Sequence, residues 1–206
     1  MDESGDESIS DASSVETESA ADSFQGDSVL VFEIDPSESE VRFIIDEVLR
    51  DEPTTVVGVS NQVAGGIAID TEDPAESKVG VTLVNARTLE TDNDFRNRAI
   101  QNQILDTGEF EFVTFTPTEI SGIPNDAMVG DVINFQITGE LVIRDFTQEV
   151  TFDVTLTPIS EERLEGKAST TIMRGDFGLT IPSVPQVADV SEEVILEIKF
   201  TAKPAN

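Results

Sequence analysis

The chain contains no cysteine, histidine, tryptophan or tyrosine among its 206 residues. Without cysteine it has neither a disulfide framework nor a thiolate nucleophile. Without histidine it lacks the commonest zinc ligand and the commonest general base at neutral pH, so a Ser-His-Asp triad is impossible. The chemistries left open are hydrolysis by paired carboxylates and calcium binding by oxygen ligands.

Basic residues are also scarce. There are 12 Lys and Arg against 42 Asp and Glu, which gives a formal net charge of −30 at pH 7. Binding to nucleic acid requires a basic surface that displaces counterions, so we expect no nucleic-acid partner and repulsion from anionic lipid surfaces. The same excess of negative charge favours a soluble chain that is a monomer or at most a weak dimer.

Long apolar runs are missing, and residues 1–27 are mostly polar. This segment has nine acidic residues and no Lys or Arg. It cannot bury enough surface to offset the entropy of ordering it, so we expect a disordered acidic Ser-rich tail or spacer, followed by one domain over residues 28–206. We find no signal-peptide core and no direct membrane span. Two interpretations remain: a cytoplasmic protein with an acidic tail, or an exported protein, periplasmic or on the cell surface, whose leader or anchor is missing from this sequence.

Period-two alternation is what the chain does contain. In residues 133–143 apolar side chains recur at every second position, and residues 150–156 alternate in the same way. Such alternation places the apolar side chains on one face of a strand. Residues 144–148 form a link short enough to return the chain antiparallel. The segment therefore predicts a long hairpin with one apolar face and one polar face.

The same pattern recurs along the rest of the domain. It covers Phe32 and Ile34, residues 41–45, 55–59, 63–69 and 79–83, Val113 and Phe115, and residues 164–172 and 194–200. Turn-forming residues such as Asp73-Pro74 separate these segments. We therefore predict an all-β fold, an antiparallel barrel of about eight strands.

One segment, residues 90–110, has helical spacing instead. Its apolar residues are Phe95, Ala99, Ile100, Ile104 and Leu105. Asp92 or Asn93 is a candidate for the N-cap, and Gly108 for the end. We predict one short helix that lies across a barrel mouth, with Phe95 and Ala99 against the barrel because residues four apart share a helix face.

Six sequence segments, taken in order, resemble the YceI-like family. They are IDPSESEVRF, VAGGIAID, SKVGVTL with RTLETDNDFRNRAIQNQILD, FTPTEI, ITGELVIRDFTQEVTFDV and MRGDFG, and together they extend over about residues 32 to 202. The resemblance implies a lipocalin-like antiparallel barrel whose interior tunnel holds polyisoprenoids or related amphiphilic chains, usually in an exported protein. The alternation supports the barrel and its apolar face independently.

If a tunnel is present, the inward-facing apolar residues should contact the lipid. The candidates are Phe43, Ile67, Val81, Leu83, Phe115, Phe135, Ile137, Phe152, Val154 and Ile198. The alternation alone fits a solid core equally well, because barrels of about eight strands are either filled by side chains or hold one ligand. Each buried methylene of a ligand contributes about 0.8 kcal/mol, so a long chain binds without many polar contacts.

The resulting prediction is a protein that binds or transports a long isoprenoid or fatty-acyl lipid without catalysis. We expect no cofactor and no metal. The run Asp70 to Asp73 is acidic but lacks EF-hand spacing, and no carboxylate pair lies in an evident apolar setting. The alternative is a ligand-free adhesion or assembly module displayed on a flexible stalk.

Polar candidates lie in or beside the predicted helix. Arg87, Arg96 and Arg98 could hold an anionic head group, or could pair with Asp92, Asp94 and Asp106 and fix the helix. Among them we favour Arg96 for the head group, because it follows Phe95 on the face assigned to the barrel.

Two further polar sites have structural interpretations. Arg174 in the MRGDFG segment is expected to form a clamp with Asp176. Glu38 precedes Ser39 where the YceI-like pattern tends to have a histidine. A polar contact attributed to that histidine is therefore not carried over. An acid at this position would repel a phosphate, which argues against a pyrophosphate-bearing ligand.

Overall fold

The computed structural model describes residues 28–183 and 187–205, so the tail predicted for residues 1–27 lies outside the described part. Within that part, thirteen strands form one antiparallel sheet. They are β1 (Val29–Ile34), β2 (Glu40–Leu49), β3 (Glu52–Ser60), β4 (Val63–Ala64), β5 (Gly66–Asp70), β6 (Lys78–Val79), β7 (Thr82–Asn85), β8 (Phe112–Ser121), β9 (Ile133–Ile143), β10 (Phe146–Ser160), β11 (Arg163–Met173), β12 (Val187–Ala188) and β13 (Glu193–Pro204). The all-β prediction is confirmed.

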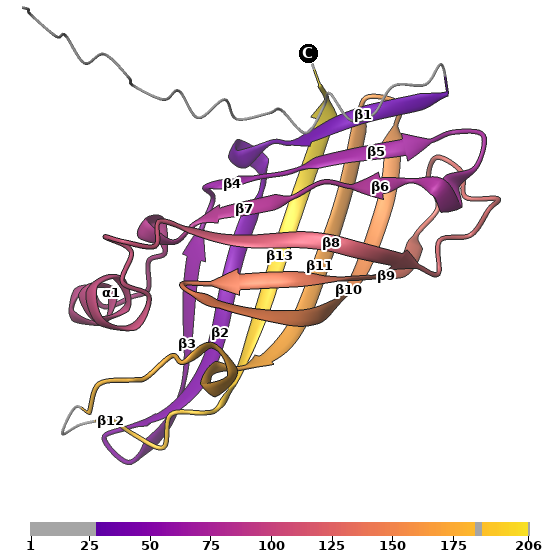
Figure 1. Ribbon diagram of the computed structural model, residues 1–206. Coiled ribbons are helices and arrows are strands. Elements are labelled where there is room, and N and C mark those ends of the chain that lie inside the picture. The colour runs from indigo at the N-terminus through magenta and orange to yellow at the C-terminus, as the bar shows by residue number, and fades with distance from the viewer. Residues whose placement is uncertain (1–27, 184–186, 206) are drawn as a thin grey trace, which may run out of the picture.

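The strands follow the order β4-β7-β8-β9-β10-β11-β13-β1-β5-β6. The long last strand, β13, pairs with two different strands along one of its edges. Its residues 195–199 pair with β2, and its residues 202–204 pair with β1. The strand β2 also pairs with β3 and β12. The sheet curls around an interior in this way, as Figure 1 shows.

Two interrupted strands bring the ends of this order together. Only Gly65 separates β4 from β5, and only Gly80 and Val81 separate β6 from β7. The strand β4 pairs with β7, while β5 pairs with β6. The four short strands are therefore one broken hairpin, and its two breaks account for two of the strands beyond the eight predicted for the lipocalin-like barrel.

The hairpin of β9 and β10 follows its sequence pattern closely. Strictly alternating burial along β9 places the apolar set inside: Ile133, Phe135, Ile137, Leu141 and Ile143. The two strands pair from Phe146 opposite Ile143 onward, so the turn is shorter than the predicted link. Arg144 supplies the turn with a left-handed backbone conformation, φ 59°.

Short helical segments connect the strands. In the described part of the chain, four are 3-10 turns: η2 (Pro36–Glu38), η3 (Pro74–Glu76), η4 (Ala86–Thr88) and η6 (Arg174–Phe177). The helix α1 (Asp94–Ala99) continues into a π-helical turn, η5 (Ile100–Ile104). Asn93 is the N-cap: its side-chain oxygen accepts hydrogen bonds from the backbone N–H groups of Phe95 and Arg96 at 2.9 and 3.1 Å. The cap prediction is thus confirmed for Asn93.

The orientation predicted for α1 is wrong. Phe95 is 79 % exposed, whereas Ile100 is 6 % exposed. Arg96, Ile100 and Ile104 are four positions apart and line the cavity together with Leu105. Phe95 lies about 140° around the helix from Ile100 and therefore faces outward. The short helix lies at one end of the barrel (Figure 1).

The buried apolar residues form two clusters within the curled sheet. One includes Phe32, Ile137 and Leu164, and the other includes Leu141 and Phe177. Phe115 packs against both. Among the described residues, the helices are too short and too polar for any to cross a bilayer.

Candidate functional site

A cavity of about 290 Å³ lies inside the curled sheet. Its lining comes from most of the strands and from the segment of α1 and η5, and it consists mainly of Val, Ile, Leu and Phe side chains. The alternation of the strands explains this composition, since one face of each strand points into the interior. The predicted interior is therefore a cavity and not a completely filled core.

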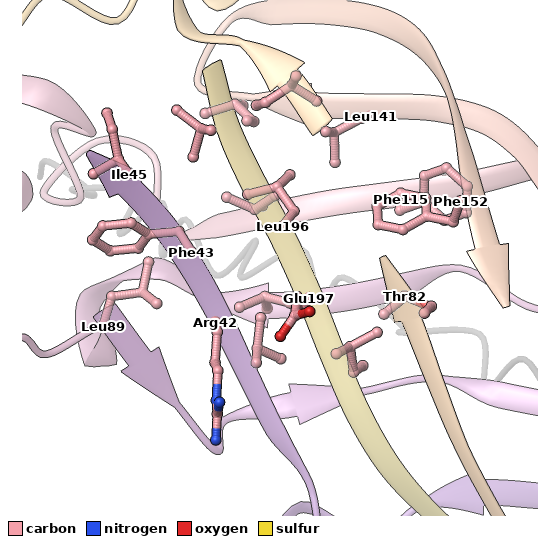
Figure 2. Close-up of a pocket in the computed structure, with 18 of the residues that line it drawn as sticks. Arg42, Phe43, Ile45, Thr82, Leu89, Phe115, Leu141, Phe152, Leu196 and Glu197 are labelled. Atoms are coloured by element: carbon pink, nitrogen blue, oxygen red, sulfur yellow. The ribbon is translucent and has the colours of Figure 1, made fainter. Parts of the chain in front are cut away.

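Most of the residues predicted to contact a lipid line this cavity. They are Phe43, Ile67, Phe115, Phe135, Ile137, Phe152, Val154, Ile198 and Arg96. Figure 2 shows Phe115 and Phe152 side by side, with Phe43 on the other side of Leu196 in that view. The rings of Phe115 and Phe152 pack edge to face, with their centroids 4.9 Å apart. Their contact with a ligand stays a prediction.

Val81 and Leu83 do not line the cavity. Thr82 and Val84 take their place, and Val81 is 42 % exposed. The physical reason is the break between β6 and β7 at Gly80 and Val81. It shifts the alternation by one residue, so extending the pattern from Val79 assigns the wrong face.

An ion pair marks the end of the cavity beneath α1. The Nη2 atom of Arg96 lies 2.9 Å from Oε1 of Glu47, and its Nη1 atom lies 2.6 Å from Oδ1 of Asp92. Both Arg96 and Glu47 line the cavity, and the Glu47 side chain is only 8 % exposed. Asp92 was among the partners predicted from the sequence.

Glu47 was not among the sequence candidates. It lies on the face of β2 that also carries Val41, Phe43 and Ile45. The signal that could have found it is an acidic residue that continues an apolar alternation. Buried carboxylates are rare unless they are paired, so such a residue calls for a cationic partner from another element.

Arg174 also lines the cavity, but its predicted partner is wrong. Its guanidinium donates to the carbonyl oxygens of Ser191 and Leu179 at 3.0 and 3.1 Å and forms an ion pair with Glu192. Asp176 follows Arg174 within the 3-10 turn η6, and its carbonyl oxygen accepts from Gln148. Arg174 thus ties η6 to the loop before β13, which is the structural role expected of it.

The other two arginines of the predicted site do not line the cavity. Arg87 pairs with Glu111 at 2.9 Å and donates to the carbonyl oxygen of Thr107 at 2.7 Å. The guanidinium of Arg98 lies 5.7 Å from the centre of the exposed Phe95 ring. Both arginines therefore make their contacts outside the cavity.

Arg42 and Glu197 are two charged residues in the wall of the cavity. They alternate with Phe43 and Leu196 along paired strands. In Figure 2 the Arg42 side chain extends away from the apolar side chains of Phe43 and Leu196. Arg42 pairs with Glu40, and Glu197 lies 2.5 Å from Nζ of Lys167. These charges are satisfied by neighbours on the strands.

Glu38 lies in a surface ion-pair cluster and is absent from the cavity lining. Its carboxylate pairs with Arg163 at 2.7 Å and with Lys203, which also lies 2.6 Å from Asp35. Hydrogen bonds from Lys203 and Ser37 lower the pKa of Asp35 to about 2. The hydrogen bond from Arg163, followed by that from Lys203, lowers the pKa of Glu38. Glu38 is thus paired with two bases outside the cavity, and its effect on a phosphorylated ligand stays a prediction.

Comparison with known proteins identifies the family. The family model described as the YceI-like domain matches residues 32–202. The chain belongs to this family. A UPF0312 protein of Shewanella oneidensis is 26 % identical over 148 residues, which cover 69 % of this chain and 73 % of that protein.

Solved structures show the same fold. A polyisoprenoid binding domain from Saccharophagus degradans, implicated in plant cell wall breakdown, superposes with a TM-score of 0.65 at 15 % identity, over 85 % of this chain and 99 % of that domain. BcnA of Burkholderia cenocepacia gives a TM-score of 0.64 at 17 % identity, over 82 % of this chain and 99 % of the other. The YceI-like barrel is therefore shared at low sequence identity.

Proposed function

We propose that this protein binds or carries a long isoprenoid or similar lipid in its interior cavity, without catalysing a reaction on it. The observation that carries the proposal is the cavity of about 290 Å³ with its nearly continuous apolar lining. The polyisoprenoid binding domain of Saccharophagus degradans, which has the same fold, supports the ligand class.

The physical basis of binding is burial of the apolar chain. Each methylene removed from water contributes about 0.8 kcal/mol, so the chain needs few polar contacts. Among the charged residues that line the cavity, Arg96 pairs with Glu47, and Arg174 pairs with Glu192 beside the cavity. They fit the recognition of one end of a lipid better than general acid-base chemistry.

A displacement experiment tests this proposal. A fluorescent polyene fatty acid is bound first and is then competed with farnesol. The absence of Trp and Tyr leaves a low fluorescence background. Saturable displacement supports the proposal. Failure of both the probe and farnesol to bind contradicts it and favours a ligand-free adhesion or assembly module.

For the polar end of the ligand we propose Arg96. Two of its nitrogens face Glu47 and Asp92, yet a guanidinium has five N–H donors, so donors remain for a head group at the cavity. Arg96→Gln should weaken binding of farnesyl phosphate more than binding of farnesol, with a smaller difference at high salt. Both affinities are measured by displacement of the polyene probe.

Arg98→Gln is the matched control, because Arg98 belongs to the same helix but stacks on the exposed Phe95. It should leave both affinities unchanged. If Arg96→Gln weakens both ligands equally, or neither, Arg96 serves only to hold α1 through its ion pairs.

The resemblance also supports action outside the cytoplasm, in the periplasm or at the cell surface. Fractionation of source cells followed by immunodetection tests this proposal. Detection in the cytoplasmic fraction alone would contradict it.

A further inference from the structure

Three glycines on the inner face of the barrel lie beneath phenylalanine rings from neighbouring strands. They are Gly58 on β3, Gly139 on β9 and Gly166 on β11, and the rings above them belong to Phe43, Phe115 and Phe200, respectively. All three phenylalanines line the cavity. Gly58 and Gly166 are the direct strand partners of the phenylalanines above them.

The rings occupy the space that a side chain would otherwise take. A Cβ atom added to Gly58 would lie 2.0 Å from Cε1 and 2.4 Å from Cζ of Phe43. At Gly166 it would lie 2.4 Å from Cζ of Phe200. Such distances are far shorter than a carbon–carbon contact of about 3.5 Å. Each ring therefore lies directly against the backbone of the next strand.

Backbone conformation does not require glycine at these positions. Positive φ angles among the described glycines occur at Gly122, Gly130 and Gly178. Gly178 also lies under a ring, that of Phe146, but neither residue lines the cavity. At the three inner positions, the feature that demands glycine is the ring. Covering a glycine with an aromatic ring stabilises a sheet, and here it also moves the ring out of the interior.

We infer that Gly58, Gly139 and Gly166 set the width of the cavity by letting three phenylalanine rings lie against its wall. A Cβ atom at any of them would push a ring inward, because the sheet closes the other side. The inference rests on the proposed lipid-binding function and extends it. The glycines make room for a methyl-branched chain and so act as specificity-determining residues.

Gly58→Ala is the cleanest test. The three nearest atoms around its added Cβ all belong to the Phe43 ring. At Gly139, by contrast, the added Cβ would also lie 2.4 Å from the carbonyl oxygen of Thr116 and would disturb the sheet itself. The probes are farnesol, which is methyl-branched, and the straight-chain alcohol with the same number of carbon atoms. Both are titrated against the bound polyene.

Gly58→Ala should reduce the affinity for farnesol at least about tenfold, the effect of one misplaced methylene in an apolar pocket. The affinity for the narrower straight-chain alcohol should fall less. The double variant Gly58→Ala/Phe43→Leu removes the displaced ring and should restore farnesol binding. Gly108→Ala, whose added Cβ would meet its nearest atom at 3.9 Å, is the control and should change neither affinity.

Equal loss for both alcohols, no loss, or no rescue by Phe43→Leu would overturn the inference. If the unaltered protein binds neither alcohol, the proposed function fails. The role of the glycines is then tested separately by a crystal structure of Gly58→Ala. A Phe43 ring turned into the cavity supports it. A ring that keeps its place while β2 and β3 separate overturns it.

Discussion

At the residue scale, charged side chains were the hardest part to predict from the sequence. Asp92 as a partner of Arg96 is a local contact, four positions earlier and just before the start of α1. Glu47 is 49 positions away, and only the curled sheet brings it beneath α1. For the same reason, Arg174 forms its ion pair with the distant Glu192 and not with its near neighbour Asp176. Alternation assigns a face to each side chain, but it does not say which distant strand or loop lies opposite.

The surface cluster around Lys203 gives a pH prediction. The pKa of Asp35 is lowered from 3.8 to about 2 by its hydrogen bonds from Lys203 and Ser37, and the pKa of Glu38 is also lowered. The folded state holds these carboxylates ionised at a pH where the unfolded chain takes up protons. Their stabilising contribution is complete above the unfolded pKa and is lost as the pH falls toward about 2.

Lys203→Met should therefore reduce the loss of thermal stability between about pH 4 and about pH 2. The measurement is the thermal midpoint by circular dichroism as a function of pH. Lys199→Met is the control, since Lys199 lies on the same strand and, within the described residues, pairs with neither Asp35 nor Glu38. Parallel curves for the unaltered protein and Lys203→Met would contradict the pairing.

At the element scale, the strands were predictable where the alternation is unbroken. β9 buries the side chains that the pattern assigns to the interior. The pattern failed at two places. The break at Gly80 and Val81 moved Val81 and Leu83 off the cavity face. In α1 the inner face is that of Arg96 and Ile100, and Phe95, five positions before Ile100, faces outward.

The orientation of α1 gives a prediction with a matched pair of variants. Ile100 is 6 % exposed and borders the cavity, so Ile100→Ala should cost about 2 kcal/mol of unfolding free energy, the lower end of the range for such truncations. Phe95 is 79 % exposed, and Phe95→Ala should change stability by no more than about 0.5 kcal/mol. Urea unfolding followed by circular dichroism measures both. Equal losses would contradict this orientation of the helix.

At the scale of the whole molecule, the sequence predicted a barrel but not whether its interior is open. The same alternating side chains are compatible with a filled core and with a cavity. The difference depends on where rings from several strands meet, and above all on inner glycines such as Gly58 and Gly139 that leave room for them. These are relations between strands far apart in the sequence, which no local pattern contains.

An open interior should tolerate an added ring. Phe152 lines the cavity, so Phe152→Trp should change unfolding free energy by less than about 1 kcal/mol, whereas overpacking a filled site costs about 1–3 kcal/mol. Leu164→Phe supplies the comparison, since Leu164 is 2 % exposed and lies outside the cavity lining. Urea unfolding measures the stability of both variants. The indole of Phe152→Trp should also weaken farnesol binding, because it occupies part of the cavity. A large loss for Phe152→Trp without any effect on farnesol would place Phe152 in a filled core.

The cavity of about 290 Å³ is proposed to hold a long apolar chain. Native mass spectrometry of the protein purified from its own source tests it most directly, because it detects whatever the cavity retains. We expect an added mass that leaves on denaturation and is recovered in organic solvent as an isoprenoid or fatty-acyl lipid. A protein that shows only its own mass, and that still fails to take up farnesol or the polyene probe, would rule out a lipid-binding cavity.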